Sequence, residues 1–458
     1  MMLFPPWNRD EFPVEYGSEH TLPLPFTESH SFNDTAPAFF FDGASSEFAM
    51  KSTGNKIDSY NKWDMQTIVI LAHGWNNSWA SFHGNEWVRT PNLDRIAAES
   101  VVFDRHFAST PHPKYWHHSF YSGKRITHSQ IAAPGSCHAS MNHLLNLFRQ
   151  SGTKLFRIIE RPSHHSSDGS VWSQNIEIHE QPGIDLGQET LTQLCSLVEI
   201  LKQSENWVLW LESNRLVPPW AVSLDHFDEY TADLIHQKGE EELIPMDEPV
   251  LGPTCFGIHQ KEILAASYAA VLTEWDKELE NWLQLFHKHG FDRTALWIVS
   301  SGHGIALGEH QFVGCDAEVP YSEFCQLPLL VRYPNALHAG RRVTHLTADI
   351  DIIPSLLDYY SLVPNTAIER RSFLPLLAGP SQPIHDSLLS VLVNEKDLTL
   401  SWTLRDSDWT SICTPVATHH LFRQPEDRWE ANDVRLHNLE LAERMETYAN
   451  SLCHHDVK

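Results

Sequence analysis

The chain has 458 residues, of which 41% are hydrophobic and 20% are charged. Its 33 Lys and Arg face 59 Asp and Glu, and the resulting net charge of −26 argues against nucleic acid or an anionic membrane as a partner. Seven cysteines without a C-x-x-C spacing are typical of reduced thiols.

The N-terminal residues M-M-L-F-P-P-W lack the basic and apolar regions of a secretory signal. No stretch approaches the ~18 apolar residues that span a bilayer. We therefore expect a cytoplasmic protein with no membrane span. Residues 1–65 are rich in Pro, Ser, Asn and acidic residues, and we predict that they form an extension to the main domain.

From residue 66 onward, short apolar runs alternate with segments of helical periodicity. Strands are predicted at residues 67–72, 101–103, 154–159, 207–211, 295–299 and 328–333, and helices at residues 91–97, 137–149, 191–201, 260–289 and 351–360. Thr90 is the expected N-cap of the first helix, with Pro91 in its first turn. This alternation predicts an α/β domain over residues 66–375, with a mostly parallel sheet flanked by helices.

The pattern changes in residues 376–458. Short strands joined by polar turns are predicted at residues 388–393, 398–405, 409–414 and 419–423, followed by a helix at residues 434–448. We expect a small C-terminal α+β subdomain with an antiparallel sheet.

The most informative stretch is residues 294–315, T-A-L-W-I-V-S-S-G-H-G-I-A-L-G-E-H-Q-F-V-G-C. A buried strand ends here in small and polar residues, at the sheet edge where ligands bind in open α/β folds. The stretch resembles the sulfatase signature S-D-H-G-x-x-L-G-x-H…G-K, and the matching residues are Ser301, His303, Gly304, Leu307, Gly308, His310 and Gly314.

Four further segments are similar to sulfatase motifs in the same order. Residues 90–97 resemble T-P-N-L-D-R-L-A, residues 268–279 resemble the family's long helix, residues 328–334 resemble V-P-L-I-V-R-x-P, and residues 349–358 resemble x-D-I-x-P-T-L-L-D. The resemblance implies the fold of the sulfatases, in the alkaline phosphatase superfamily.

The resemblance also implies positions for the family's catalytic groups. The tandem metal-binding Asp pair falls at His73-Gly74 and a later metal-binding Asp at Gly302, while the nucleophile falls at Pro113. The family's Arg and Lys fall at His117 and Cys315. No residue is assigned as catalytic, because a site without these groups lacks the means to stabilise a developing oxyanion. We expect a pseudo-sulfatase with a binding or regulatory role, whose partner is a small anionic ligand or a protein.

An alternative is an active sulfuric ester or phosphate ester hydrolase with a rebuilt site. His73 and His303 follow strands that should be neighbours, with His112, His117 and His118 on the loop between, and imidazoles suit Zn²⁺ or another borderline metal. On the main hypothesis no cofactor is expected, and Ca²⁺ or Mg²⁺ is unlikely without carboxylate ligands.

The expected pocket gathers His73, Pro113, His117, Gly302, His303 and Cys315. Large aromatic neighbours should fill the space beside Gly74 and Gly302, and the candidates are Trp75, Tyr115 and Trp116. Cys315 is expected to be a buried inert thiol, with a nucleophile or ligand as the alternative. Glu212 and Arg215 are expected to form an ion pair with each other.

Overall fold

Strand β1 (Gln66–Ala72) lies in the middle of the main sheet and pairs in parallel with β5 (Trp207–Ser213) and β7 (Ala295–Ser300). The computed structural model describes residues 65–126, 143–162, 171–181, 185–238, 243–316, 318–364, 371–379, 382–394, 399–415 and 419–454. Most of the predicted extension, residues 1–64, therefore lies outside the described residues, as do residues 137–142 of a predicted helix.

Within the described residues the main sheet has nine strands in the order β11-β2-β10-β7-β1-β5-β3-β4, with β12 also paired to β2. The remaining members are β2 (Val101–Phe107), β3 (Lys154–Glu160), β4 (Gln174–Ile178), β10 (Gln326–Arg332), β11 (Arg342–Val343) and β12 (Thr347–Ala348). Only β10 runs antiparallel to its neighbours among these pairs. The predicted mostly parallel sheet is confirmed.

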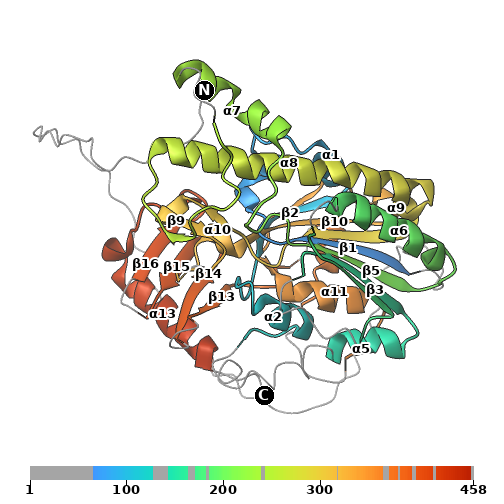
Figure 1. The fold of residues 1–458 in the computed structure, drawn as a ribbon. Helices are drawn as coiled ribbons and strands as arrows, with labels where there is room; N and C mark the ends of the chain where they lie inside the picture. The colour runs from blue at the N-terminus through green and yellow to red at the C-terminus, as the bar shows by residue number, and fades with distance from the viewer. Residues whose placement is uncertain are drawn as a thin grey trace, which may run out of the picture. The chain divides into compact units, whose positions relative to one another are not determined.

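Helices cover both faces of this sheet (Figure 1). One face packs against α1 (Pro91–Ala98), α6 (Leu186–Lys202), α7 (Leu224–Lys238) and the long α8 (Ile258–Lys288). The other packs against α2 (Trp116–Ser122), α5 (His143–Gln150), α11 (Ile352–Tyr359) and α12 (Leu374–Leu377). Successive side chains of a strand point to opposite faces, so both faces of β1 are apolar: Ile68 and Ile70 enter the first core, Val69 and Leu71 the second.

The N-terminus of α1 is held by a distant residue rather than by its own N-cap. Thr90 makes no capping bond with its side chain, and its hydroxyl instead bonds Ser81 at 2.8 Å. The carboxylate of Asp276, on α8, accepts hydrogen bonds from the backbone N–H groups of Asn92 (3.0 Å) and Leu93 (2.7 Å). Thr90 is thus the N-cap residue, as predicted, but the carboxylate of Asp276 rather than its own side chain supplies the acceptor that orphan helix N–H groups need.

The second sheet is antiparallel and consists of β13 (Leu388–Val393), β14 (Leu400–Arg405), β15 (Trp409–Cys413) and β16 (His419–Arg423). Helix α13 (Leu439–His454) packs on it through a shared apolar cluster. The predicted strands are confirmed, but the helix begins at Leu439 rather than at residue 434, because residues Arg435–His437 form a separate 3-10 turn. Ser59–Lys458 is one compact unit, and the predicted boundary after residue 375 stays a prediction.

Short elements complete the described part of the chain. They are β6 (Gly252–Pro253), β8 (Ala306–Leu307) and β9 (Phe312–Gly314), which form a three-stranded sheet, the helices α9 (Phe291–Thr294) and α10 (Ser322–Cys325), and 3-10 turns at Asn77–Trp79, Ser81–His83, Glu309–Gln311, Pro334–Ala336 and Asp349–Asp351. Among the described helices, none combines the length and the hydropathy needed to cross a membrane.

Candidate functional site

The ends of β1 and β7 bring His73 and Gly302 into direct contact. The two strands are parallel neighbours, so the residues that follow them lie at the same edge of the sheet. Nδ1 of His73 accepts a hydrogen bond from the Gly302 N–H at 3.1 Å, and the Gly74 N–H donates to the carbonyl of His303 at 3.0 Å. The rings of His73 and His303 lie 5.7 Å apart, as their place after adjacent strands predicted.

The hydrogen bond from Gly302 fixes the protonation of His73. Since Nδ1 is an acceptor, the proton of the neutral ring is on Nε2, which lies 4.0 Å from Oε2 of Glu212. Burial, together with His303, His117 and Arg157, lowers the pKa of His73 well below its ordinary value. His73 is therefore a neutral ring, and its Nδ1 can reach a metal only by giving up the backbone bond.

Glu212, near the end of β5, is a buried carboxylate that faces His73 and His117. Its carboxylate accepts hydrogen bonds from the hydroxyl of Tyr121 at 2.6 Å and from Nη2 of Arg157 at 2.7 Å. The side chains of Glu212 and Arg157 are both fully buried. Buried charges need such paired partners, and in this cluster the charges of Arg157 and Glu212 neutralise each other.

The predicted pairing of Glu212 with Arg215 is wrong. Arg157 lies on β3, the strand next to β5, and Ile159 of β3 is level with Glu212. Arg157 is thus two residues away on the adjacent strand, which puts both side chains on one face as diagonal neighbours. Arg215 lies beyond the strand and pairs with Glu278 of α8.

Trp116, the first residue of α2, closes the space beside Gly302. Its ring lies 3.7 Å from that of His117 and 4.3 Å from that of His73. A Cβ atom added to Gly302 would lie 2.6 Å from Cδ2 of Trp116, a distance that side-chain carbons do not tolerate. The prediction that an aromatic residue fills this space is confirmed for Trp116.

The other two aromatic candidates lie elsewhere. Trp75 packs edge-on against Phe82 and Trp275 in the core under α8. Tyr115 lies against His112, with ring centroids 4.9 Å apart. Beside Gly74 the space is taken by backbone instead, because a Cβ there would meet the carbonyl oxygen of Leu216 at 2.9 Å.

The remaining histidines do not form one convergent group. His117 and His118 lie in helix α2 rather than on a loop, and Nε2 of His117 is 4.0 Å from Oε2 of Glu212. His112 lies before this helix, with its Nε2 3.2 Å from Oδ1 of Asp316. Nδ1 of His303 lies 3.1 Å from the carbonyl of Gly304, which leaves its Nε2 with a lone pair.

Pro113 and Cys315 contribute no reactive group. Pro113 is half-buried in the segment before α2, next to His112. Cys315 is buried in the apolar core under α8, and burial followed by the nearby Asp316 raises the pKa of its thiol far above the ordinary value. This burial agrees with the inert role predicted for Cys315, because a protonated thiol is a poor nucleophile and ligand.

Metal-ligand geometry in the described residues occurs away from this edge. Three donor atoms within 4.8 Å of one another belong to Cys413, His419 and Glu446 of the second sheet and α13. His73 and His303 are not members of such a group among the described residues.

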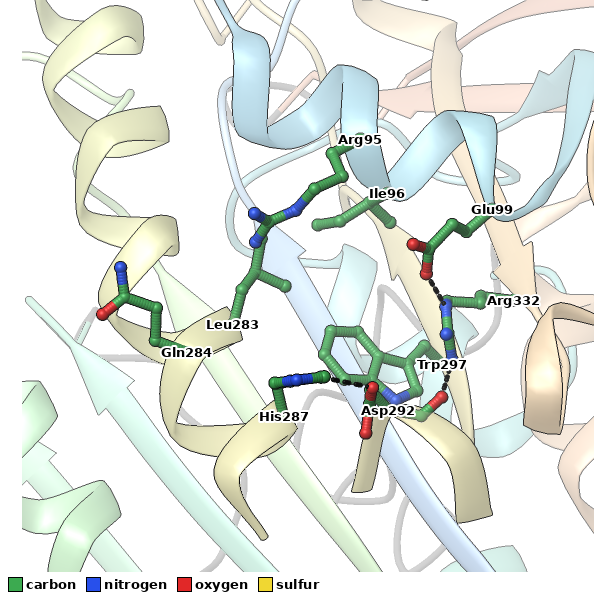
Figure 2. A pocket seen from close by; sticks show the side chains of 9 residues that line it. All are labelled: Arg95, Ile96, Glu99, Leu283, Gln284, His287, Asp292, Trp297 and Arg332. Atoms are coloured by element: carbon green, nitrogen blue, oxygen red, sulfur yellow. Dashed lines mark hydrogen bonds and ion pairs between the residues drawn. The ribbon is translucent and has the colours of Figure 1, made fainter. Parts of the chain in front are cut away.

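A separate cavity of about 270 Å³ lies near the start of β7, at the opposite end of this strand from Gly302, between α1, α8 and β10 (Figure 2). Arg332 contacts three residues that line the cavity. Its Nε donates a hydrogen bond to Glu99 at 2.8 Å, and another guanidinium N–H donates to the carbonyl of Asp292. The guanidinium also lies 5.7 Å from the ring of Trp297. The cavity is lined by Arg95, Ile96, Glu99, Leu283, Gln284, His287, Asp292, Trp297 and Arg332, none of which was predicted as a site residue. The Arg of the segment P-L-L-V-R thus ties α1 to the start of β7.

Comparison with known proteins places this fold. The family model for the C-terminal region of N-sulphoglucosamine sulphohydrolase matches residues 308–391. An N-acetylglucosamine-6-O-sulfatase of Bacteroides thetaiotaomicron is 28% identical over 110 residues, which are 24% of this chain and 19% of the relative. The multifunctional alkaline phosphatase superfamily protein PehA of Trinickia caryophylli is 29% identical over 117 residues, which are 25% of this chain and 22% of the relative.

These sequence matches span about a fifth of each relative's length. The structural likeness is broader. The solved structure of BT4656 in complex with its substrate D-glucosamine-2-N,6-O-disulfate aligns with a TM-score of 0.66 at 15% identity, covering 85% of this chain and 97% of that one. The chain has the fold of the sulfatases, and residues 308–391 match the model of a sulphohydrolase family. A shared fold does not by itself establish a shared activity, because function resides in the site.

Sequence reasoning missed the cluster of Tyr121, Arg157 and Glu212. A signal was present, because Arg157 stands inside the apolar run L-F-R-I-I and Glu212 inside W-L-E-S. Charged residues within runs that read as buried strands must be paired in the folded protein. In the folded chain the two runs are adjacent strands, which makes the pairing possible.

Proposed function

We propose that this chain is a sulfatase-family protein that does not hydrolyse sulfate or phosphate esters at the edge of β1 and β7, and that it has a binding or regulatory role. The observation that carries the proposal is the contact of Trp116 with Gly302. The resemblance places a metal-binding Asp at this position, and a side chain there would overlap the indole ring. The volume that a carboxylate and its cation would need is taken by an aromatic ring.

The charges at this edge support the same conclusion. Hard cations are held by several carboxylate oxygens, which also neutralise much of their charge. Here Glu212 is the acidic group among the clustered side chains, and Arg157 and Tyr121 already occupy both of its oxygens. Adding a divalent cation would break a fully buried ion pair, which is a strongly unfavourable change.

The residues at the positions of the family's nucleophile and Arg support it further. The resemblance aligns Pro113 with the nucleophile, and proline offers no side-chain atom to attack an ester. His117, aligned with the family's Arg, stacks on Trp116 and faces Glu212 from 4.0 Å. Losing one oxyanion-stabilising donor typically lowers kcat by about a hundredfold to a thousandfold, and several are replaced here.

The test is turnover of an aryl sulfate and an aryl phosphate by purified protein, with Ca²⁺, Mg²⁺, Mn²⁺ or Zn²⁺ added in turn. We expect rates equal to those of buffer with the same metal. Turnover that is well above this background and is abolished by His303→Gln would overturn the proposal. It would support the second candidate, a hydrolase with a metal on the free Nε2 of His303.

The ligand in a binding role is proposed to be a small anion or a protein partner. The relatives' names concern sulfated glucosamine derivatives, which makes D-glucosamine-2-N,6-O-disulfate the first anion to test by calorimetry. Binding without turnover would support a role in recognition. Turnover of this sugar would contradict the proposal directly.

A further inference from the structure

A second cluster of reactive side chains lies at one end of the antiparallel sheet. Cys413 is the last residue of β15 and His419 is the first residue of β16, and the two are paired across the hairpin. Helix α13 packs on this sheet and brings Glu446 to the same place. Three residue types that bind metals therefore meet where two strands and a helix come together.

The donor atoms are close to one another. Sγ of Cys413 lies 2.8 Å from Nε2 of His419, and Nδ1 of His419 lies 3.0 Å from Oε2 of Glu446. One sulfur, one nitrogen and one oxygen atom of the trio lie within 4.8 Å of each other. All three residues are half-buried, so the cluster is open to an ion from solvent but is held by its surroundings.

A second thiol lies near this trio on α13. Cys453 follows Glu446 by seven residues, a spacing that places both on one face of a helix. Cys453 and Cys413 pack against the same apolar cluster, and both thiols are free.

We propose that Cys413, His419 and Glu446 form a binding site for Zn²⁺, with a fourth position left open to solvent. Zn²⁺ is bound by thiolate, imidazole and carboxylate ligands in tetrahedral sites, and this set offers all three types. The ion would tie the end of the β15–β16 hairpin to α13. The inference concerns the second sheet and does not depend on the function proposed for the edge of β1 and β7.

The same order of groups, thiol to imidazole to carboxylate, also occurs where a thiol acts as a nucleophile. In such a site the imidazole passes a proton between the thiol and the carboxylate. Here one sulfur, one nitrogen and one oxygen atom lie within 4.8 Å of each other, which favours a shared metal ion over such a proton relay through His419. A disulfide between Cys413 and Cys453 is the other alternative, and a count of free thiols in the unreduced protein distinguishes it from the metal site.

The experiment uses the full-length protein freed of metal with a chelator and titrated with Co²⁺, which reports thiolate ligation by a sulfur-to-metal charge-transfer band. We expect one Co²⁺ per chain with this band, displaced by one equivalent of Zn²⁺. Cys413→Ser should abolish the band and weaken Zn²⁺ binding by more than about a hundredfold, beyond the 10–100-fold loss typical of residues outside the ligand shell. Cys195→Ser, at an exposed cysteine, is the matched control and should bind as the wild type.

Glu446→Gln provides a second test in case Cys413→Ser fails to fold, because Gln keeps the size of the Glu side chain. A normal circular dichroism spectrum with weakened Zn²⁺ binding in this variant supports the site. The proposal is overturned if the wild type shows no charge-transfer band, if Cys413→Ser binds Zn²⁺ as tightly as the wild type, or if Cys413 and Cys453 are oxidised together. Loss of binding in His303→Gln but not in Cys413→Ser would overturn it as well, and would place the metal at the main sheet.

Discussion

The two ends of β7 differ in how their polar groups are packed, and we call each end, with its neighbouring strands, an edge of the main sheet. At the carboxyl ends of β1 and β7, Trp116 and the backbone fill the space beside the two glycines, and a buried ion pair lies behind them. At the other edge a cavity of about 270 Å³ remains, ringed by half-exposed charges around Arg332 (Figure 2). One edge is closed around a buried ion pair, while the other still meets water.

This difference has an energetic consequence. The Arg157–Glu212 pair has both side chains at 0% exposure, whereas in the Arg332–Glu99 pair the Glu99 side chain is 48% exposed. Removing one partner of a buried pair leaves an uncompensated charge, while an exposed pair exchanges its partner for water. The first edge should therefore be far more sensitive to substitution than the second.

The largest expected effect is that of Glu212→Gln. It leaves the buried Arg157 guanidinium without its counter-charge, and we expect a loss of about 3–5 kcal/mol in the free energy of unfolding. The measurement is urea denaturation near neutral pH. Glu99→Gln is the matched control at the other edge and should cost less than about 1 kcal/mol. Equal losses of unfolding free energy in Glu212→Gln and Glu99→Gln would show that the two edges do not differ in sensitivity to substitution.

The neighbours of the closed edge were only partly predictable from sequence. The apolar runs of β1 and β7 can be recognised as buried strands from the sequence alone. Because these strands are neighbours, His73 lies beside Gly302. The partner of Glu212 depends instead on β3 lying next to β5, and strand order is set by the packing of the whole sheet.

Helix ends show the same limit. Thr90 has the local sequence of an N-cap, but Asp276 reaches α1 from 184 residues away in sequence and supplies the hydrogen-bond acceptor. The helix predicted from residue 434 begins only at Leu439, because Arg435–His437 forms a separate 3-10 turn. Local patterns predict which elements exist, whereas tertiary contacts decide their caps and partners.

A second test uses pH. Burial lowers the pKa of His303 to about 4, compared with about 6.5 in an unfolded chain. Between these values the unfolded state binds a proton that the folded state does not, so the stability contributed by neutral His303 is present above pH ~6.5 and is lost as the pH falls toward ~4. The loss should approach about 3 kcal/mol at about 1.4 kcal/mol per unit.

His303→Gln isolates this effect, because the variant lacks the titrating ring. The free energy of unfolding of the wild type minus that of the variant should decrease as the pH falls from ~7 to ~4. His287→Gln is the control at the open edge, where the side chain is 78% exposed. A difference for His303→Gln that stays constant over this range would show that the ring is not held neutral by the closed edge.

A smaller effect tests the contact of Trp116 with Gly302 itself. Gly302→Ala adds a methyl group where the indole already lies, and overpacking of this kind typically costs about 1–3 kcal/mol. In a Trp116→Ala background the same change should cost less, since the clash with the indole is gone, only the contact with Nδ1 of His73 at 2.9 Å remains, and contacting residues are not additive. Gly257→Ala, where a Cβ meets no atom within 4 Å, is the control. Additive losses would mean that Trp116 does not fill this space.

The smallest expected effect is that of Ca²⁺ on thermal stability, which we predict to be none. A ligand at a hundred times its Kd adds about 2.7 kcal/mol to the stability of the folded state, so a bound ion would raise Tm clearly. Ca²⁺ prefers six to eight oxygen ligands, whereas the closed edge presents imidazole rings and a carboxylate already paired with Arg157. A rise in Tm with Ca²⁺ that Glu212→Gln removes would show that the closed edge still binds a hard cation. Zn²⁺ is expected to raise Tm through the second sheet, so this rise should vanish in Cys413→Ser and persist in His303→Gln.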